Sequence, residues 1–166
     1  MSSDSPVHRA PPGDPPGFEL PLRLLLGFRS IIDDLHAELA RQGHPDTRPM
    51  HGFVFQAIGP AGTTAAELGR RLGISKQAAG KTVDSLERLG YVRREPDRRD
   101  QRQKIVVLTE RGFDMLDRSA RIFEDVRAQW ASILGPERLR ELEADLRTVT
   151  GDVVVPVDVP GWFGAG

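Results

Sequence analysis

The sequence contains no cysteine and no long apolar segment, and each absence narrows the possible functions. Without cysteine the chain has no thiolate for catalysis, no cysteine ligand for a metal and no thiol that could sense oxidants. No apolar run approaches the roughly 18 residues that a membrane-spanning helix needs, and the N-terminus lacks the apolar core of a signal peptide. We therefore expect a cytoplasmic protein without a membrane partner.

Motifs typical of enzymes are also missing. The sequence has no glycine-rich phosphate loop, no nucleophile elbow and no H-E-x-x-H pair. Asp33 and Asp34 are consecutive, so on a helix their carboxylates diverge and cannot share one proton site. We expect neither an enzyme nor a bound cofactor.

Charge is nearly balanced over the whole chain but unevenly placed. The formal net charge is -1, which argues against an indiscriminate nucleic-acid binder. Residues 67–104 hold 11 basic and 6 acidic residues, a net +5, which leaves -6 for the remainder. A basic segment on an acidic body fits directed DNA binding better than non-specific adhesion.

Two short helical patterns flank a tight turn in this basic segment. Thr64 and Glu67 have the spacing of a capping box, and helical periodicity follows over residues 65–72. Gly73 suits the left-handed position that ends a helix, and Ser75 is a good N-cap for a second helix over residues 76–89. The buried face of that second helix is predicted to hold Ala79, Val83 and Leu86.

The opposite face of the second helix is polar near its N-terminus, the end that recognition helices lead into the major groove. The residues expected to contact DNA there are Ser75, Lys76, Gln77, Gly80 and Lys81. Gly80 costs about 1 kcal/mol relative to alanine in a helix. It therefore predicts either close approach to DNA or tight packing against the preceding helix. The plainer alternative is a solvated polar face on an ordinary helical hairpin.

A charged β-hairpin pattern follows directly. Residues 91–94 and 104–108 have strand character, and a turn-rich loop over residues 96–103 joins them. An arginine at the tip of such a wing can enter a narrow minor groove. The loop arginines expected to contact DNA are Arg98, Arg99 and Arg102. Asp100 is expected to shape the wing by pairing with Arg102 across the loop.

Residues 64–112 resemble the MarR family of bacterial transcription regulators. The resemblance depends on three pieces: the run AAELGRRLGISKQAAGKTVDSLERLGYVRREPD, the D-x-R of Asp100 and Arg102, and LTERG at the end. It implies a mainly α fold with a small β-hairpin wing, in which a winged helix-turn-helix domain carries N- and C-terminal dimerisation helices. It also implies a homodimer that regulates transcription.

The flanking segments complete this organisation. Residues 1–17 are predicted to be a disordered Pro-rich tail, residues 18–150 the winged-helix domain and residues 151–166 a C-terminal tail. Within the domain, residues 50–109 form the DNA-binding lobe, while residues 18–41 and 110–150 supply surplus apolar surface for dimerisation. The expected apolar positions of the first helix are Leu22, Leu25, Phe28 (or Leu26), Ile32, Leu35 and Leu39. Those of a short helix over residues 50–58 are Phe53, Val54 and Ala57. After the wing, a helix of about 25 residues has Phe113, Leu116, Ala120, Phe123, Val126 and Trp130, and the last helix has Leu139, Leu142, Leu146 and Val149.

The resemblance also implies a small aromatic or anionic effector, bound between the dimerisation helices and the lobe. The candidate contacts are Arg29, His36, His51 and Phe55, although core or surface positions without a ligand explain each of them as well. An alternative is a zinc site gathered from His36, His44, Asp46 and His51.

Together these features predict a homodimeric, sequence-specific DNA-binding regulator, most simply a ligand-responsive repressor that binds an inverted-repeat operator. The alternatives are a winged-helix module that binds protein or DNA without specific readout, and a zinc-responsive regulator. Two-fold symmetry would place two recognition helices about 34 Å apart, in successive major grooves.

Overall fold

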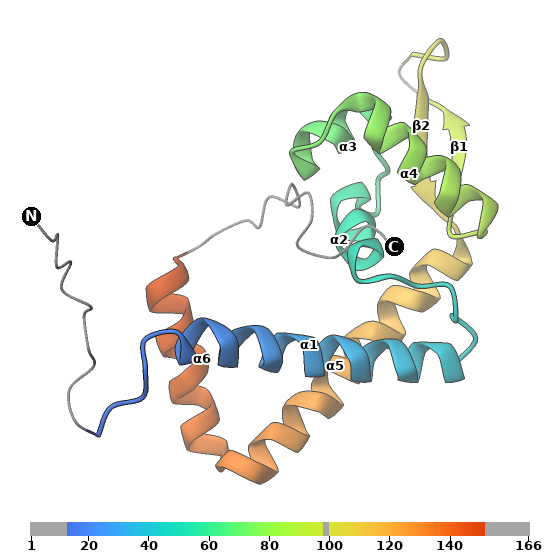
Figure 1. Ribbon diagram of the computed structural model, residues 1–166. Helices are drawn as coiled ribbons and strands as arrows, with labels where there is room; N and C mark the ends of the chain where they lie inside the picture. The colour runs from blue at the N-terminus through green and yellow to red at the C-terminus, as the bar shows by residue number, and fades with distance from the viewer. Residues whose placement is uncertain (1–12, 98–99, 152–166) are drawn as a thin grey trace, which may run out of the picture.

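The computed structural model describes residues 13–97 and 100–151 (Figure 1). Most of the two predicted tails therefore lies outside the described residues. The elements are α1 (Glu19–Arg41), α2 (Pro49–Ile58), α3 (Ala65–Leu72), α4 (Lys76–Arg88), β1 (Val92–Pro96), β2 (Lys104–Leu108), α5 (Glu110–Leu134) and α6 (Pro136–Thr150). The predicted mainly α fold with a small β-hairpin is confirmed.

The elements form a central lobe and an outer set of helices. Helices α2, α3 and α4 pack with the β1–β2 hairpin to form the lobe, while α1, α5 and α6 extend away from it (Figure 1). Helix α5 begins beneath the hairpin, crosses α1 and turns at Gly135 into α6. Because α5 contacts α1, α2, α6 and β2, it connects the two parts.

The core lies mainly inside the lobe and continues where α1 and α5 pack together and against it. Its largest fully buried side chains include Tyr91, Phe55, Leu39 and Ile58. The expected inward face of α2 was in part wrong, because Phe53 is only half-buried whereas Phe55 and Ile58 are fully buried beside the expected Val54. The predicted Ala57 does pack against the core.

The face that α5 turns inward also differs from the predicted stripe. The buried positions are Met115, Ser119, Ile122 and Val126, whereas the predicted Phe113 and Phe123 are 46% and 42% exposed. Ala120 is also exposed, while Leu116 and Trp130 pack partly against the core as expected. The helix carries apolar residues on two faces, and packing against α1 and the lobe buries only one of them.

The outer helices leave much apolar surface uncovered in the single chain. In α1 only Leu35 and Leu39 of the predicted stripe are buried. The exposed apolar residues of the outer helices include Leu20, Leu22, Leu24, Leu25, Leu26, Phe123, Ile133 and Val149.

The joint between hairpin and α5 explains the L-T-x-x-G pattern. The Thr109 hydroxyl donates to the carbonyl of Gly90 at 2.6 Å and accepts from the N–H of Gly112 at 3.2 Å, which caps α5. A Cβ at Gly112 would press against the carbonyl oxygen of Tyr91. Only glycine lets the helix approach the start of the hairpin this closely.

Candidate nucleic-acid interface

The turn between α3 and α4 has the geometry that the sequence predicts. Thr64 Oγ1 accepts from the N–H of Glu67 at 3.1 Å, and Ser75 Oγ accepts from the N–H of Ala78 at 3.1 Å, so both helices are capped. Gly73 adopts φ 68° and ψ 21°, the left-handed conformation that ends α3. A Cβ at Gly69 would lie 2.9 Å from the carbonyl oxygen of Ile74, so the close approach of the turn depends on a glycine.

Helix α4 separates a buried face from a solvent face as expected. Ala79, Val83 and Leu86 are fully buried against the lobe. The predicted contacts Ser75, Lys76, Gln77 and Lys81 are exposed, and Gly80 is half-exposed beside them. No atom lies within 4 Å of a Cβ built at Gly80, so tight packing as the reason for this glycine is wrong.

The hairpin is antiparallel, with Val92 opposite Leu108 and Pro96 opposite Lys104. Thr63 adds a short third edge, because its N–H and carbonyl bond to Val106 at 3.0 and 2.7 Å. The register fixes both ends of the connecting loop, so the hairpin forms a stiff wing beside α4.

Asp100 organises the tip of the wing through the backbone. Its Oδ1 accepts from the N–H of Arg102 at 3.0 Å, and its carbonyl accepts from the N–H of Gln103 at 2.9 Å. The expected Asp100–Arg102 pair is therefore made by the main chain of Arg102 and leaves its guanidinium exposed. Arg98 and Arg99, the other predicted wing contacts, lie outside the described residues.

Ion pairs divide the basic residues of this region into two groups. Arg70 and Arg71 pair with Glu67, Arg93 pairs with Glu95, and Arg94 pairs with Asp84 and Glu87. Within the described parts of residues 67–104, the basic side chains without an ion pair are Lys76, Lys81, Arg88, Arg102 and Lys104. These uncompensated charges sit on α4 and the wing, so they define the basic surface.

Two members of this set, Arg88 and Lys104, were missed by the sequence prediction. Arg88 is exposed in the last turn of α4, and Lys104 is exposed at the start of β2. Their charges were visible in the sequence, and Asp84 stands four residues before Arg88 on the same helix. The structure shows that Arg94 pairs with this acid.

The four residues predicted to contact an effector occupy different environments. Arg29 is exposed and pairs with Asp33 at 3.6 Å, and His36 is half-buried on the same helix. Phe55 is fully buried, with its ring centroid 5.6 Å from that of Tyr91. His51 lies 6.2 Å from Phe55 between ring centroids and is 7% exposed. The structure therefore brings only the last two predicted residues into mutual contact.

His51 also has a structural task at the start of α2. Its Nδ1 accepts from the N–H of Arg48 at 3.2 Å. Burial, with smaller contributions from Arg48 and His36, lowers the pKa of His51 to about 4. The ring is thus neutral at pH 7, as an acceptor at this position must be.

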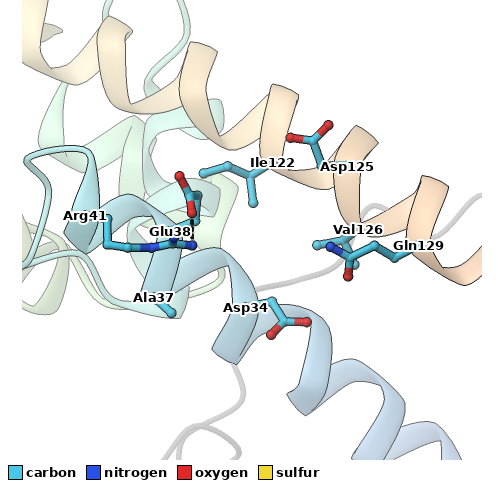
Figure 2. A pocket seen from close by; sticks show the side chains of 8 residues that line it. All are labelled: Asp34, Ala37, Glu38, Arg41, Ile122, Asp125, Val126 and Gln129. Carbon is cyan, nitrogen blue, oxygen red and sulfur yellow. Dashed lines mark ion pairs between the residues drawn. The ribbon is translucent and has the colours of Figure 1, made fainter.

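A cleft of about 210 Å³ opens between α1 and α5 (Figure 2). Its lining is mainly polar and acidic and includes none of the predicted effector contacts. The lining residues are Asp34, Ala37, Glu38, Arg41, Ile122, Asp125, Val126 and Gln129.

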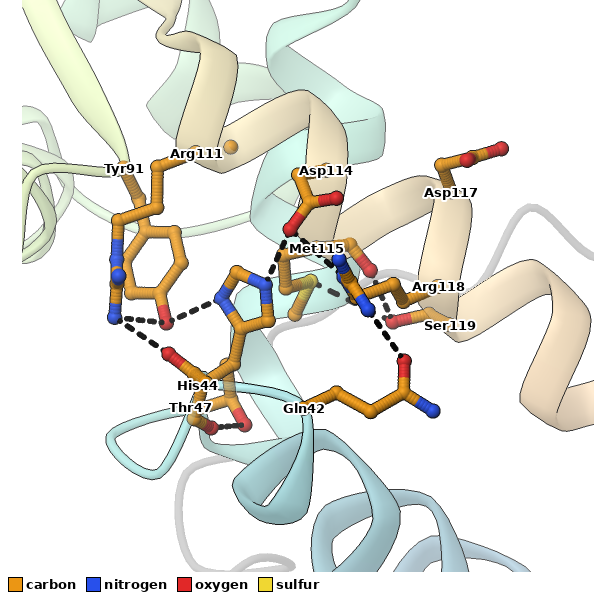
Figure 3. A network of polar contacts seen from close by, with 12 residues as sticks. Gln42, His44, Thr47, Tyr91, Arg111, Asp114, Met115, Asp117, Arg118 and Ser119 are labelled. Atoms are coloured by element: carbon orange, nitrogen blue, oxygen red, sulfur yellow. Dashed lines mark hydrogen bonds and ion pairs between the residues drawn. The ribbon is translucent and has the colours of Figure 1, made fainter.

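His44 is engaged in a buried network and is not gathered with the other histidines (Figure 3). Its Nδ1 lies 3.0 Å from the Tyr91 hydroxyl and its Nε2 lies 2.9 Å from Asp114 Oδ2. Hydrogen bonds from Arg118 and from His44 hold the pKa of the Asp114 carboxyl below its usual range. The ionised carboxylate favours the tautomer with a proton on Nε2, so Nδ1 accepts from Tyr91.

The same network occupies a histidine on which the zinc alternative depends. The two ring nitrogens of His44 already have partners, and His51 uses Nδ1 to cap α2. Within residues 13–97 and 100–151 no three histidine, aspartate or glutamate side chains are arranged to hold a metal ion.

These observations define a winged helix-turn-helix protein. Residues 46–103, about a third of the chain, match the model of the MarR family. Over this segment the chain is similar to the MarR family. Among the described residues no helix is long and apolar enough to cross a membrane.

Individual relatives match parts of the chain. An uncharacterised HTH-type transcriptional regulator, YcgE of Bacillus subtilis, is 46% identical over 82 residues, which cover 49% of this chain and 51% of that protein. A riboflavin kinase of Thermoplasma volcanium is 38% identical over 53 residues, which cover 32% of this chain and 23% of the kinase. The chain thus spans at most about half the length of these curated relatives.

The fold is shared more widely than the sequence. The crystal structure of Streptococcus pneumoniae FabT in complex with DNA has a TM-score of 0.66 and 17% identity, and the match covers 80% of this chain and 94% of that one. A match over 80% of this chain extends well beyond the helix-turn-helix.

Proposed function

We propose that the protein is a sequence-specific DNA-binding transcription regulator that acts as a homodimer on an inverted-repeat operator. The observation that carries the proposal is the exposed N-terminal half of α4, where Lys76, Gln77 and Lys81 face solvent. The two lysines have no ion pair with any described residue, and neither do Arg102 and Lys104 of the wing. This end of a recognition helix is the one that reads base edges. The FabT structure in complex with DNA supports the same use of the fold.

In this proposal α4 supplies base contacts and the wing supplies backbone and minor-groove contacts. Ser75, Gln77 and Gly80 lie at the groove edge, with Lys76 and Lys81 near phosphates or guanines. The wing contacts are Arg98, Arg99 and Arg102, with Asp100 shaping the loop.

We infer that the exposed apolar surface of α1, α5 and α6 joins two copies of the chain. One recognition helix reads only one half-site, and a dimer aligns two of them with successive major grooves about 34 Å apart. A repressor of this kind would release DNA when a small aromatic or anionic effector changes that separation. Arg29 and His36 are its candidate contacts, since His51 and Phe55 are buried.

The test begins with footprinting on DNA that flanks the protein's own gene, followed by titration of the protected duplex and a scrambled duplex over a salt series. A regulator retains a large specificity ratio as salt rises, and its footprint has two-fold symmetry. A module without specific readout, the competing function, loses affinity for both duplexes together.

Substitutions then locate the contacts. Lys81→Ala is expected to weaken binding to the protected duplex by about 1–3 kcal/mol without unfolding the chain. Arg98→Ala with Arg99→Ala is expected to weaken binding to most sequences alike. Arg121→Ala, which removes one charge from an exposed part of α5 as Lys81→Ala does from α4, is the control for the single variant. Unchanged affinity in both test variants would refute this placement.

A further inference from the structure

Arg94 belongs to the wing strand β1, but its side chain binds α4. Its Nη2 donates to Asp84 Oδ1 at 2.6 Å, and its Nη1 pairs with Glu87 Oε2. The backbone N–H of Arg94 donates to Glu87 Oε1 at 3.1 Å. The guanidinium thus bridges the carboxylates of Asp84 and Glu87, and the main-chain N–H of Arg94 adds a second contact to Glu87.

The bridge joins the two elements that face DNA in the proposed function. Asp84 follows Lys81 by three residues, almost one turn further along α4, and Glu87 follows Asp84 by the same interval. Beyond Arg94 the strand continues to Pro96 and the wing tip. Any tilt of the wing away from α4 would therefore break the contacts of Arg94.

The shape of the guanidinium matters as much as its charge. A planar fork that binds two carboxylates fixes distance and rotation together, whereas the ammonium of lysine is a point charge on a flexible stem. The Arg94 side chain is only 28% exposed, compared with 55% for its neighbour Arg93. The side chain of Arg94 therefore serves a contact inside the protein, whereas within the described parts of the chain no ion pair is made by Lys76, Lys81, Arg88, Arg102 and Lys104.

We propose that Arg94 is a positioning residue for DNA recognition: by bridging Asp84 and Glu87 it fixes the angle between α4 and the wing, so that both engage one site together. The inference rests on the proposed function. Two other roles make different predictions, namely direct contact of Arg94 with a phosphate, and simple neutralisation of two acids near the DNA.

The experiment uses the duplex that the wild-type full chain enriches from a random-sequence pool, together with a scrambled duplex of equal length. If the wild type enriches no site, the proposed function fails before Arg94 is tested. Once a site is known, the measured quantity is the ratio of the two affinities over a salt series, with thermal unfolding recorded in parallel.

Arg94→Gln and Arg94→Lys are both expected to lower the specificity ratio by about tenfold, with an unchanged salt slope. A lost phosphate contact would instead reduce the slope by about 1 and weaken both duplexes alike. A role limited to neutralisation would leave Arg94→Lys with the wild-type ratio. Either of these two results overturns the proposal.

The double variant Asp84→Asn with Glu87→Gln removes the two carboxylates that Arg94 bridges. It tests the positioning role even if the Arg94 variants do not fold. Removal of two negative charges near the duplex raises affinity for all DNA on electrostatic grounds. Positioning predicts in addition that the specificity ratio falls by about tenfold. A wild-type ratio in this variant contradicts the proposal.

Arg93→Gln is the matched control. It removes the same charge from the adjacent residue of the same strand, where the side chain pairs with Glu95 and not with α4. Its specificity ratio should equal that of the wild type, and a loss as large as that of Arg94→Gln would overturn the proposal.

Discussion

Gly112 of α5 and Gly80 of α4 differ in what an added methyl group would meet. A Cβ at Gly112 would press against the carbonyl oxygen of Tyr91, whereas a Cβ at Gly80 has no neighbour within 4 Å. We predict that Gly112→Ala lowers the free energy of unfolding by about 1–3 kcal/mol through overpacking. Gly80→Ala should raise it by about 1 kcal/mol. Denaturant titration of both variants measures the contrast, and equal effects would contradict it.

The Gly80→Ala variant also tests the remaining explanation for this residue. If the backbone of α4 approaches DNA at Gly80, the added methyl group should weaken binding to the protected duplex although the fold is more stable. A variant that is stabilised and binds like the wild type would remove Gly80 from the interface.

Of the two explanations predicted for Gly80, tight packing is wrong and a DNA contact stays a prediction. The sequence predicted a packing reason or a DNA contact at Gly80, but the close approach occurs at Gly69 and involves the carbonyl of Ile74. That carbonyl is placed by the left-handed Gly73, so its direction depends on the folded turn. Capping residues such as Thr64 and Ser75 were predictable because their hydrogen bonds span only three residues.

His51, in the first turn of α2, accepts a hydrogen bond through Nδ1 and must therefore remain neutral. Its pKa of about 4, lowered chiefly by burial, lies below the value of about 6.5 in an unfolded chain. Between these values the unfolded chain binds the proton more tightly, so the contribution of His51 to stability is complete above pH 6.5 and is lost as pH falls towards 4. The loss over this window should be about 3 kcal/mol.

The variant His51→Gln isolates this effect, because glutamine offers an acceptor oxygen but does not titrate. Denaturant unfolding of the variant should show a flatter dependence of stability on pH between 7 and 4 than the wild type. The carboxylates titrate equally in both proteins and cancel in the difference. Parallel pH profiles would show that His51 is not responsible.

At the level of elements, the sequence predicted where helices begin and end better than which way they face. Thr109 and Gly135 mark the ends of α5 through local geometry. The buried face of α5 depends on distant segments, since Met115 and Ile122 belong to the core whereas Phe113 and Phe123 do not. Both faces are apolar in sequence, so periodicity alone could not choose between them.

At the scale of the whole molecule, the outer helices expose an apolar surface that contacts within one chain do not bury. Leu24, Leu25 and Leu26 of α1 are 47%, 52% and 48% exposed. We predict that Leu25→Glu converts a dimer into a monomer, because a charge cannot be buried there without a partner. Sedimentation velocity measures the change, and affinity for the protected duplex should fall with it.

Gln56→Glu, which adds a charge to an exposed position of the central lobe, is the control for assembly and should sediment like the wild type. A wild-type chain that is monomeric at micromolar concentration would contradict the proposed dimer. The amount of surplus apolar surface was predictable from the sequence, but its distribution over α1, α5 and α6 required the packed structure.

The buried contacts around His44 limit how this molecule can bend. His44 bonds Tyr91 at the base of the wing and Asp114 of α5, while Arg111 of α5 donates to Tyr91 and to the carbonyl of Gly43. In the proposed dimer, each subunit should therefore rotate as one rigid body about the outer helices. A small molecule bound among the outer helices would then move the wing tips furthest, whereas bending within one subunit would first have to break the hydrogen bonds of His44 and Arg111.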